Sequence, residues 1–176
     1  MRPHRLLGIL GATAAYQFIA ISIVISPWFS FYDNALSDLG NLALHGSTGW
    51  IYNMGLIVSG FLVASFSVLV SLRNPSWKYL VWTVPLAAAG VDLTMIGFFP
   101  EDAGTIHLLV SVVFFVLIDV TMFLYSYASW PIGSPAVGAV ALAFGLASTT
   151  IWFAAWPWRG VAIQEAQVYS AEVAGV

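Results

Sequence analysis

Residues 107–127 read HLLVSVVFFVLIDVTMFLYSY, and this stretch decides the fold. A helix needs about 20 mostly apolar residues to cross the hydrocarbon core of a bilayer, and this stretch has that length. Asp119 is the single acidic residue in it, and there is no lysine or arginine. Comparable apolar runs cover residues 6–28, 50–72, 79–98 and 136–156. The sequence therefore predicts an all-α integral membrane helical bundle with five transmembrane helices.

The composition of the whole chain agrees with a membrane location. Of the 176 residues, 60% are hydrophobic and 7% are charged, and the mean hydropathy is +0.91. Soluble domains carry about 25% charged residues, so most of this surface must face lipid. The absence of cysteine excludes disulfides and thiolate chemistry. The net charge of −3 favours no nucleic-acid partner.

The segment 29–49 differs from the apolar runs on either side of it. It reads FSFYDNALSDLGNLALHGSTG, which is too polar to span a membrane and too apolar for an ordinary loop. We interpret it as a short helix at the membrane interface, with leucines and an alanine forming its apolar side. The aromatic residues near the predicted span ends are typical of interfacial belts.

The last part of the chain is harder to place. The run 136–156 is rich in glycine and alanine, which let helices approach closely in lipid, so we expect it inside the bundle. Residues 161–176 follow a break at 157–160 and are short for a span. They are interpreted as a partial sixth helix, a truncated end or an interfacial helix. The chain 1–176 is predicted to be one transmembrane domain.

The basic residues indicate an orientation. If the spans alternate, Arg2, Arg5, Arg73 and Lys78 share one membrane face, and Arg159 is alone on the other. The positive-inside rule then places the N-terminus in the cytoplasm of a protein of the cell membrane. The outer face receives most of the other ionisable residues: Asp33, Asp38, His45, Glu101, Asp102, His107 and Glu165. This one-sided convergence is the strongest functional indication in the sequence.

Four residues of the chain are candidates for catalysis: Asp38, Asp92, His107 and Ser111. His107 and Ser111 are four residues apart, so they share one helix face. A histidine beside a carboxylate can activate a hydroxyl group or a water molecule for hydrolysis. A pocket at this depth would meet lipid headgroups or ester bonds.

A second, overlapping set could bind a divalent metal ion: His45, Glu101, Asp102 and His107. Histidine and carboxylate side chains are common metal ligands in proteins. Haem ligation by His45 and His107 is a further geometric alternative. The sequence also allows a ligand-binding site without any chemistry.

The same residues have a purely structural interpretation. Asp38 would cap the interfacial helix, Glu101 and Asp102 would cap the span that follows them, and His107 would bond to a loop carbonyl group. Within the spans, Asp92 and Asp119 are carboxylates that are functional by default unless they are protonated. Their neutral forms could bond to neighbouring hydroxyl groups: Thr94, Thr121 or Tyr16.

Two motifs carry a family resemblance. Residues 35–41 read ALSDLGN, and residues 97–102 read GFFPED and are followed by His107 and Ser111. Together they resemble a family of small polytopic membrane proteins of prokaryotes, domain of unknown function 998. Residues 160–165, GVAIQE, resemble the family's entry to its last helix, with Gln164 where proline is usual. The resemblance implies about six helices and no particular activity.

These observations lead to two functional hypotheses. The first is a polar site at the outer leaflet that binds a metal ion or a lipid headgroup and supports lipid hydrolysis. A likeness to seven-span membrane hydrolases that use zinc is an analogy at the level of fold. The alternative is a non-catalytic accessory or scaffold subunit of a larger membrane complex. The sequence does not decide whether the protein is an enzyme, and its expected partners are the bilayer, a lipid headgroup or other membrane subunits.

Overall fold

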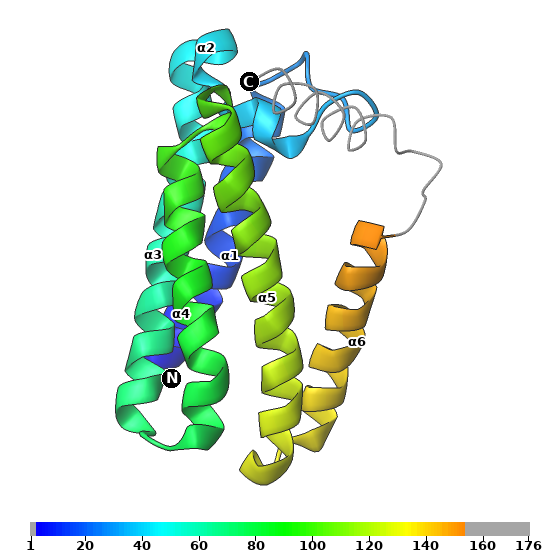
Figure 1. Ribbon diagram of the computed structural model, residues 1–176. Coiled ribbons are helices and arrows are strands. Elements are labelled where there is room, and N and C mark those ends of the chain that lie inside the picture. The colour runs from blue at the N-terminus through cyan, green and yellow to red at the C-terminus, as the bar shows by residue number, and fades with distance from the viewer. Residues whose placement is uncertain (1–2, 154–176) are drawn as a thin grey trace.

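The computed structural model describes residues 3–153, which contain helices and connecting turns but no strand (Figure 1). The long helices are α1 (Pro3–Val24), α3 (Gly49–Arg73), α4 (Trp77–Phe98), α5 (Thr105–Ile132) and α6 (Pro135–Phe153). The short ones are η1 (Leu36–Gly40), α2 (Leu42–His45), η2 (Gly46–Thr48) and η3 (Glu101–Ala103). The prediction of an all-α bundle is confirmed.

The helices have the lengths and compositions of membrane spans. Within the described residues, four helical stretches are long and apolar enough to cross a bilayer: Leu6–Val24, Leu42–Arg73, Trp77–Phe98 and Thr105–Ile132. The apolar stretch Pro135–Ile151 in α6 is shorter. Large apolar side chains remain exposed along these helices, as expected of surfaces that face lipid. The protein is therefore a helical membrane protein.

The long helices pack mainly against their neighbours in the chain. α3 lies between α1 and α4, α5 packs on α4, and α6 packs on α5. Glycine makes the close contact between α3 and α4 possible, since a Cβ atom at Gly60 would lie 2.5 Å from the carbonyl oxygen of Gly90. Helices in lipid associate through such close backbone packing. The pair α3 and α4 forms the centre of the bundle.

The expectation that the glycine- and alanine-rich helix lies inside the bundle is wrong for the described residues. α6 packs chiefly on α5 and leans away from the other helices toward its C-terminal end (Figure 1). Its glycines bring a single face into contact, with Gly138 against Ser129 and Gly145 against Phe123. The opposite faces expose large apolar side chains such as Phe144. The small residues of α6 correctly predicted a close contact with another helix. They did not predict how many helices would pack against α6.

Two connections differ from the sequence-based expectation. The segment 29–49 holds three short helices, η1, α2 and η2, in place of one interfacial helix. The helix predicted at 107–127 continues to Ile132 and ends where Gly133 adopts a left-handed conformation with φ of 84°. Glycine takes this conformation without steric cost, and it commonly ends helices. The predicted tail, 161–176, lies outside the described residues.

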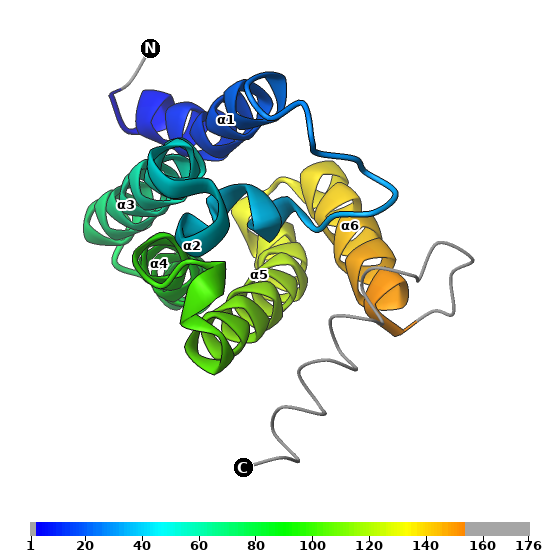
Figure 2. The ribbon, with the colours of Figure 1, turned by 90° about the horizontal axis from the view of Figure 1, so that it is seen from above.

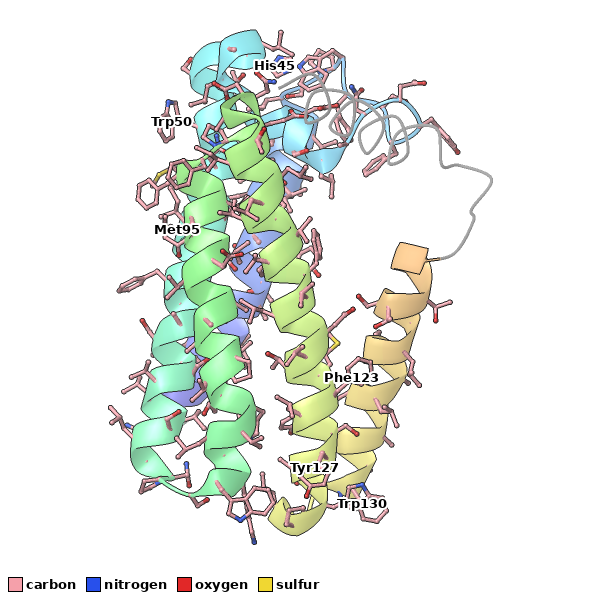
Figure 3. All side chains as sticks on the ribbon, viewed as in Figure 1. His45, Trp50, Met95, Phe123, Tyr127 and Trp130 are labelled. Atoms are coloured by element: carbon pink, nitrogen blue, oxygen red, sulfur yellow. The ribbon has the colours of Figure 1, made fainter. Side chains whose placement is uncertain are left out.

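Aromatic side chains mark both ends of the bundle (Figure 3). Trp50 lies near one end, and Tyr127 and Trp130 lie near the other. All three are largely exposed. Tryptophan and tyrosine gather where a membrane meets water, because their rings are apolar and their tips are polar. The spacing of the two groups is consistent with a bilayer that covers the long helices between them.

Candidate functional site

One end of the bundle collects the described carboxylates that lie outside the long helices, whereas the predicted outer-face residue Glu165 lies outside the described residues. The chain leaves α1, passes outward near α6 and returns over the centre through η1 and α2 (Figure 2). This segment carries Asp33 and Asp38, and η3 beside it carries Glu101 and Asp102. We call this region, residues 25–48 with 99–107, the acidic end. The predicted convergence of ionisable residues is present here.

The two basic side chains that the structure describes lie at the opposite end. Arg73 ends α3, and Lys78 lies in the first turn of α4. Lys78 donates a hydrogen bond to the carbonyl oxygen of Pro131, near the end of α5. Within the described side chains, the acidic end therefore has no lysine or arginine to balance its carboxylates.

Asp38 caps the first short helix. Its Oδ2 atom accepts hydrogen bonds from the side-chain amide of Asn34 and from the backbone N–H of Ala35, each at 3.0 Å. The second of these bonds is the half of a capping box in which the side chain of the third helical residue accepts from the backbone of the N-cap residue, here Ala35. An aspartate in this position satisfies donors that a helix start leaves unpaired. The structural interpretation of Asp38 as a cap is therefore supported.

Two long-range hydrogen bonds fix the segment to the rest of the bundle. Asp102 Oδ1 accepts a bond from the backbone N–H of Leu42, the first residue of α2, at 3.0 Å. The buried Asn53 of α3 donates from its amide nitrogen to the carbonyl oxygen of Gly40 at 2.8 Å. The expectation that Asp102 caps the following span is replaced by a bond across the chain. These contacts hold η1 and α2 over the helix ends.

His107 is buried beneath the loop that joins α4 to α5. Its Nδ1 atom lies 2.8 Å from the carbonyl oxygen of Phe99, which is the loop bond that the structural interpretation expects. Asp102 lies close enough to act on the ring electrostatically. Ser111 is one turn further along α5 and half-buried. The hydrogen bonds of the described residues link neither Ser111 nor Asp38 to His107.

His45 lies at the outer surface of the acidic end (Figure 3). Its ring stacks on the indole of Trp28, with ring centres 3.9 Å apart and planes 9° from parallel. Trp28 follows the end of α1, so the stack joins the first and last parts of the segment between α1 and α3. Trp28 is 41% exposed, which leaves an aromatic surface open beside the carboxylates.

A buried tyrosine of α3 lies near two of the carboxylates. Tyr52 of α3 is 7% exposed and packs with Leu39 of η1. Glu101 and Asp38 both lie close enough to interact electrostatically with its hydroxyl group. The half-buried Glu101 is therefore directed toward the same interior region as Asp38. Asp38, Glu101 and Tyr52 come from three separate parts of the chain, and the fold brings them together.

The two carboxylates within the spans lie apart from this region. Asp92 occupies the second half of α4, and its Oδ2 atom is buried without a hydrogen-bond partner among the described residues. Asp119 accepts a bond from Thr149 of α6. The hydrogen bonds of the described residues do not link either carboxylate to Thr94 or Thr121, whose hydroxyl groups donate to carbonyl oxygens of their own helices.

The metal ligands predicted from the sequence do not form a compact group. Within residues 3–153, no group of three or more histidine, aspartate and glutamate side chains is placed to hold a metal ion. His45 faces Trp28 at the surface, whereas His107 is buried under the loop. Ligation of a haem from both sides needs two histidines that face each other. The different surroundings of His45 and His107 therefore disfavour it.

A family model matches residues 9–174, nearly the whole chain. The chain belongs to the family described as protein of unknown function (DUF998). The match includes both motifs of the acidic end in this DUF998 protein, 35–41 and 97–102. No curated protein matches the chain, and no solved structure does.

Several residues in the acidic end or in contact with it were not singled out from the sequence. Asn53, Tyr52 and Trp28 each make a contact described above, with Gly40, Leu39 and His45 respectively. Of these three residues, Asn53 is the one that the sequence could have indicated. A lone amide side chain in an apolar run needs a hydrogen-bond partner within the protein, because lipid offers none. The partners themselves come from distant parts of the chain and leave no local pattern.

Proposed function

We propose that this DUF998 protein binds a cationic ligand at its acidic end, and that the ligand is the ammonium group of a lipid headgroup. The observation that carries the proposal is the one-sided charge. Asp33, Asp38, Glu101 and Asp102 share an end at which the described residues place no lysine or arginine. Clustered charge of one sign attracts ligands of the opposite sign.

The chemistry of the surface favours an ammonium group. Exposed aromatic side chains lie at the same end of the bundle as the carboxylates, in the segment between α1 and α3 and at the start of α3: Trp28, Phe31, Tyr32 and Trp50. Aromatic faces attract ammonium ions, and their enrichment at this level suits a site that lies among headgroups. The bonds that hold the segment use Oδ2 of Asp38 and Oδ1 of Asp102, so each carboxylate has a second oxygen atom to offer.

The orientation supports the outer leaflet as the source of this lipid. The turn with Arg73 and Lys78 lies opposite the acidic end, and the positive-inside rule assigns such a turn to the cytoplasm. The acidic end would then meet the outer leaflet of the cell membrane. A divalent metal ion shares the positive charge, and the predicted ligands His45, Glu101, Asp102 and His107 make it the second source to test. Lipid hydrolysis by Ser111 and His107 would be a later step at the same place.

The experiment is native mass spectrometry of the protein in nanodiscs that contain phosphatidylethanolamine and phosphatidylglycerol. Wild type should retain phosphatidylethanolamine preferentially. The double variant Glu101→Gln and Asp102→Asn should weaken this retention. Each ion pair that is lost contributes roughly 1 kcal/mol, so its loss should lower the affinity for phosphatidylethanolamine about fivefold. The matched control is the double variant Glu101→Asp and Asp102→Glu, which keeps both negative charges and should keep the preference for phosphatidylethanolamine. Equal retention by the double variant and wild type would refute the proposal.

Elemental analysis of the same samples distinguishes the two sources of positive charge. About one zinc or iron atom per chain in wild type, lost in His107→Ala, would assign the site to a metal ion instead. Lysolipid that accumulates with wild type and not with Ser111→Ala would add hydrolysis. A second membrane protein that copurifies at a fixed ratio, with no lipid preference, would favour the accessory-subunit alternative.

A further inference from the structure

A second polar site lies between α5 and α6, remote from the acidic end. Asp119 is near the middle of α5, whose 28 residues run from Thr105 to Ile132. The hydroxyl group of Thr149 in α6 donates a hydrogen bond to Asp119 Oδ2 at 3.0 Å. The other carboxyl oxygen, Oδ1, is buried and has no hydrogen-bond partner within the described part of the chain.

The packing of the two helices holds the carboxyl group in place. Gly138 contacts Ser129, Gly145 contacts Phe123, and Thr149 bonds to Asp119, so one face of α6 follows α5 along its length. Figure 3 shows Phe123 directed from α5 toward α6. A Cβ atom at Gly145 would lie 3.2 Å from the Phe123 ring, which is a tight contact. The Asp119–Thr149 bond is the last of these contacts, near the end where α6 leans away.

Among the residues that the structure describes, the helices beside this carboxyl group bring no positive charge to its level. The sequence of α6, Pro135–Phe153, contains no ionisable residue. α4, the other neighbour of α5, has the ionisable residues Lys78, Tyr79 and Asp92. Lys78 is bonded to Pro131 at the end of α5, and Tyr79 lies beside Trp82 below the level of Asp119. On α5 itself the ionisable residues are His107, Tyr125 and Tyr127.

The register of α4 against α5 places Asp92 at a different depth. Phe99 of α4 contacts His107 of α5, and Trp82 contacts Tyr125, with ring centres 5.0 Å apart. Between these two contacts, Asp119 lies level with the alanines that precede Asp92 by about one turn of helix. Within the described part of α4 and α5, this register brings the acidic Asp92, and no basic residue, to within about one turn of the level of Asp119. An ionised carboxylate in such surroundings costs several kcal/mol, whereas a neutral acid costs far less.

We infer that Asp119 and Thr149 form a proton-binding site within the membrane, whose proton-bound form is the neutral carboxyl group of Asp119. In this form Oδ1 carries the proton and Oδ2 accepts the hydrogen bond of Thr149. The neutral acid lets α6 stay against α5 at this level. Loss of the proton would place a charge between the two helices and favour their separation, because the carboxylate would seek water.

The first test uses a hydrophobic carbodiimide, which modifies protonated carboxyl groups inside membranes. The acid gives its proton to one nitrogen atom of the reagent while its oxygen adds to the central carbon. The resulting O-acylisourea rearranges to a stable N-acylurea, so no further reactant is needed. In detergent-solubilised wild type at neutral pH, mass spectrometry should locate the adduct on Asp119. The exposed Asp33 is the internal control and should stay unmodified.

The second test is infrared spectroscopy of the same protein in nanodiscs. Wild type should show the carbonyl band of a protonated carboxyl group, and Asp119→Asn should lose it. Thr149→Val keeps the acid but removes its hydrogen-bond donor, so the band should move to higher wavenumber. This variant keeps the test decisive if Asp119→Asn does not fold. A structural bond to an ionised Asp119 would give no such band in either protein.

Three outcomes would overturn the inference. One is a wild-type spectrum whose Asp119-dependent band is that of a carboxylate. Another is an adduct on Asp92 or Asp33 with Asp119 unmodified. The third is a protonated-acid band that Thr149→Val leaves unmoved. None of them concerns the acidic end, so the result is independent of lipid binding there.

Discussion

Replacing Gly90 with alanine tests how closely α3 and α4 are packed. A Cβ atom at Gly90 would lie 2.6 Å from the backbone nitrogen of Ala64 and 2.8 Å from the carbonyl oxygen of Gly60. Both are backbone atoms, so no side-chain rotation relieves the clash. Ordinary contact begins at 3.4 Å, and the helices must therefore separate locally by about 0.8 Å. A gap of this size forfeits roughly a quarter to a half of each dispersion contact that it opens.

The expected loss of stability follows from this movement. Overpacking a close interface costs about 1–3 kcal/mol, and we expect Gly90→Ala near the upper end because rigid backbone must move. The free energy of unfolding would be measured in mixed micelles by titration with dodecyl sulfate, with helix content followed by circular dichroism. Gly8→Ala is the control, since its Cβ would meet only the Phe66 ring at 3.1 Å, and that ring can turn. Equal losses in the two variants would refute the reasoning.

Three further variants test the acidic end. Asn53→Ala should lower the free energy of unfolding by about 1–3 kcal/mol, because it leaves the buried carbonyl group of Gly40 without its donor; an unchanged denaturation curve would contradict this. Asp102→Ala should speed hydrogen exchange at the amide of Leu42, whereas Asp102→Asn keeps an acceptor and should protect it, and equal rates would contradict the bond. Asp38→Ala should cost about 0.5–2 kcal/mol as a lost cap, against almost nothing for an exposed aspartate, as the same titration would show.

Much of the fold could be predicted because hydropathy is a local property. An apolar run of span length must be a helix in lipid, whatever its neighbours are, since its backbone has no other partner. The gathering of carboxylates at one end could also be predicted, because successive spans alternate in direction. Residues Asp38 and Glu101, which follow the first and third spans, then have to meet on the same face.

The partners within that end could not be predicted in the same way. The bond between Leu42 and Asp102 joins residues 60 positions apart, and nothing in either local sequence specifies the other. The prediction of the position of α6 was wrong for a related reason. Gly138 and Gly145 indicate that some helix comes close, but hydropathy is the same for a surface that faces lipid and one that faces protein. Side-chain roles that depend on tertiary contacts cannot be predicted until the positions of the helices are known.

The bond between Leu42 and Asp102 also sets an order of events during synthesis. The amide of Leu42 reaches the membrane surface before its acceptor has been translated, since 60 residues separate them. At roughly 5–20 residues per second, the acceptor follows after about 3–12 seconds. During that interval the segment after α1 can make its local contacts, such as the Asp38 cap, and its bond to Asn53 of α3, but not its bond to Asp102. The hydrogen bond to Asp102 can therefore form only after the connection between α4 and α5 has been synthesised, later than the bond to Asn53.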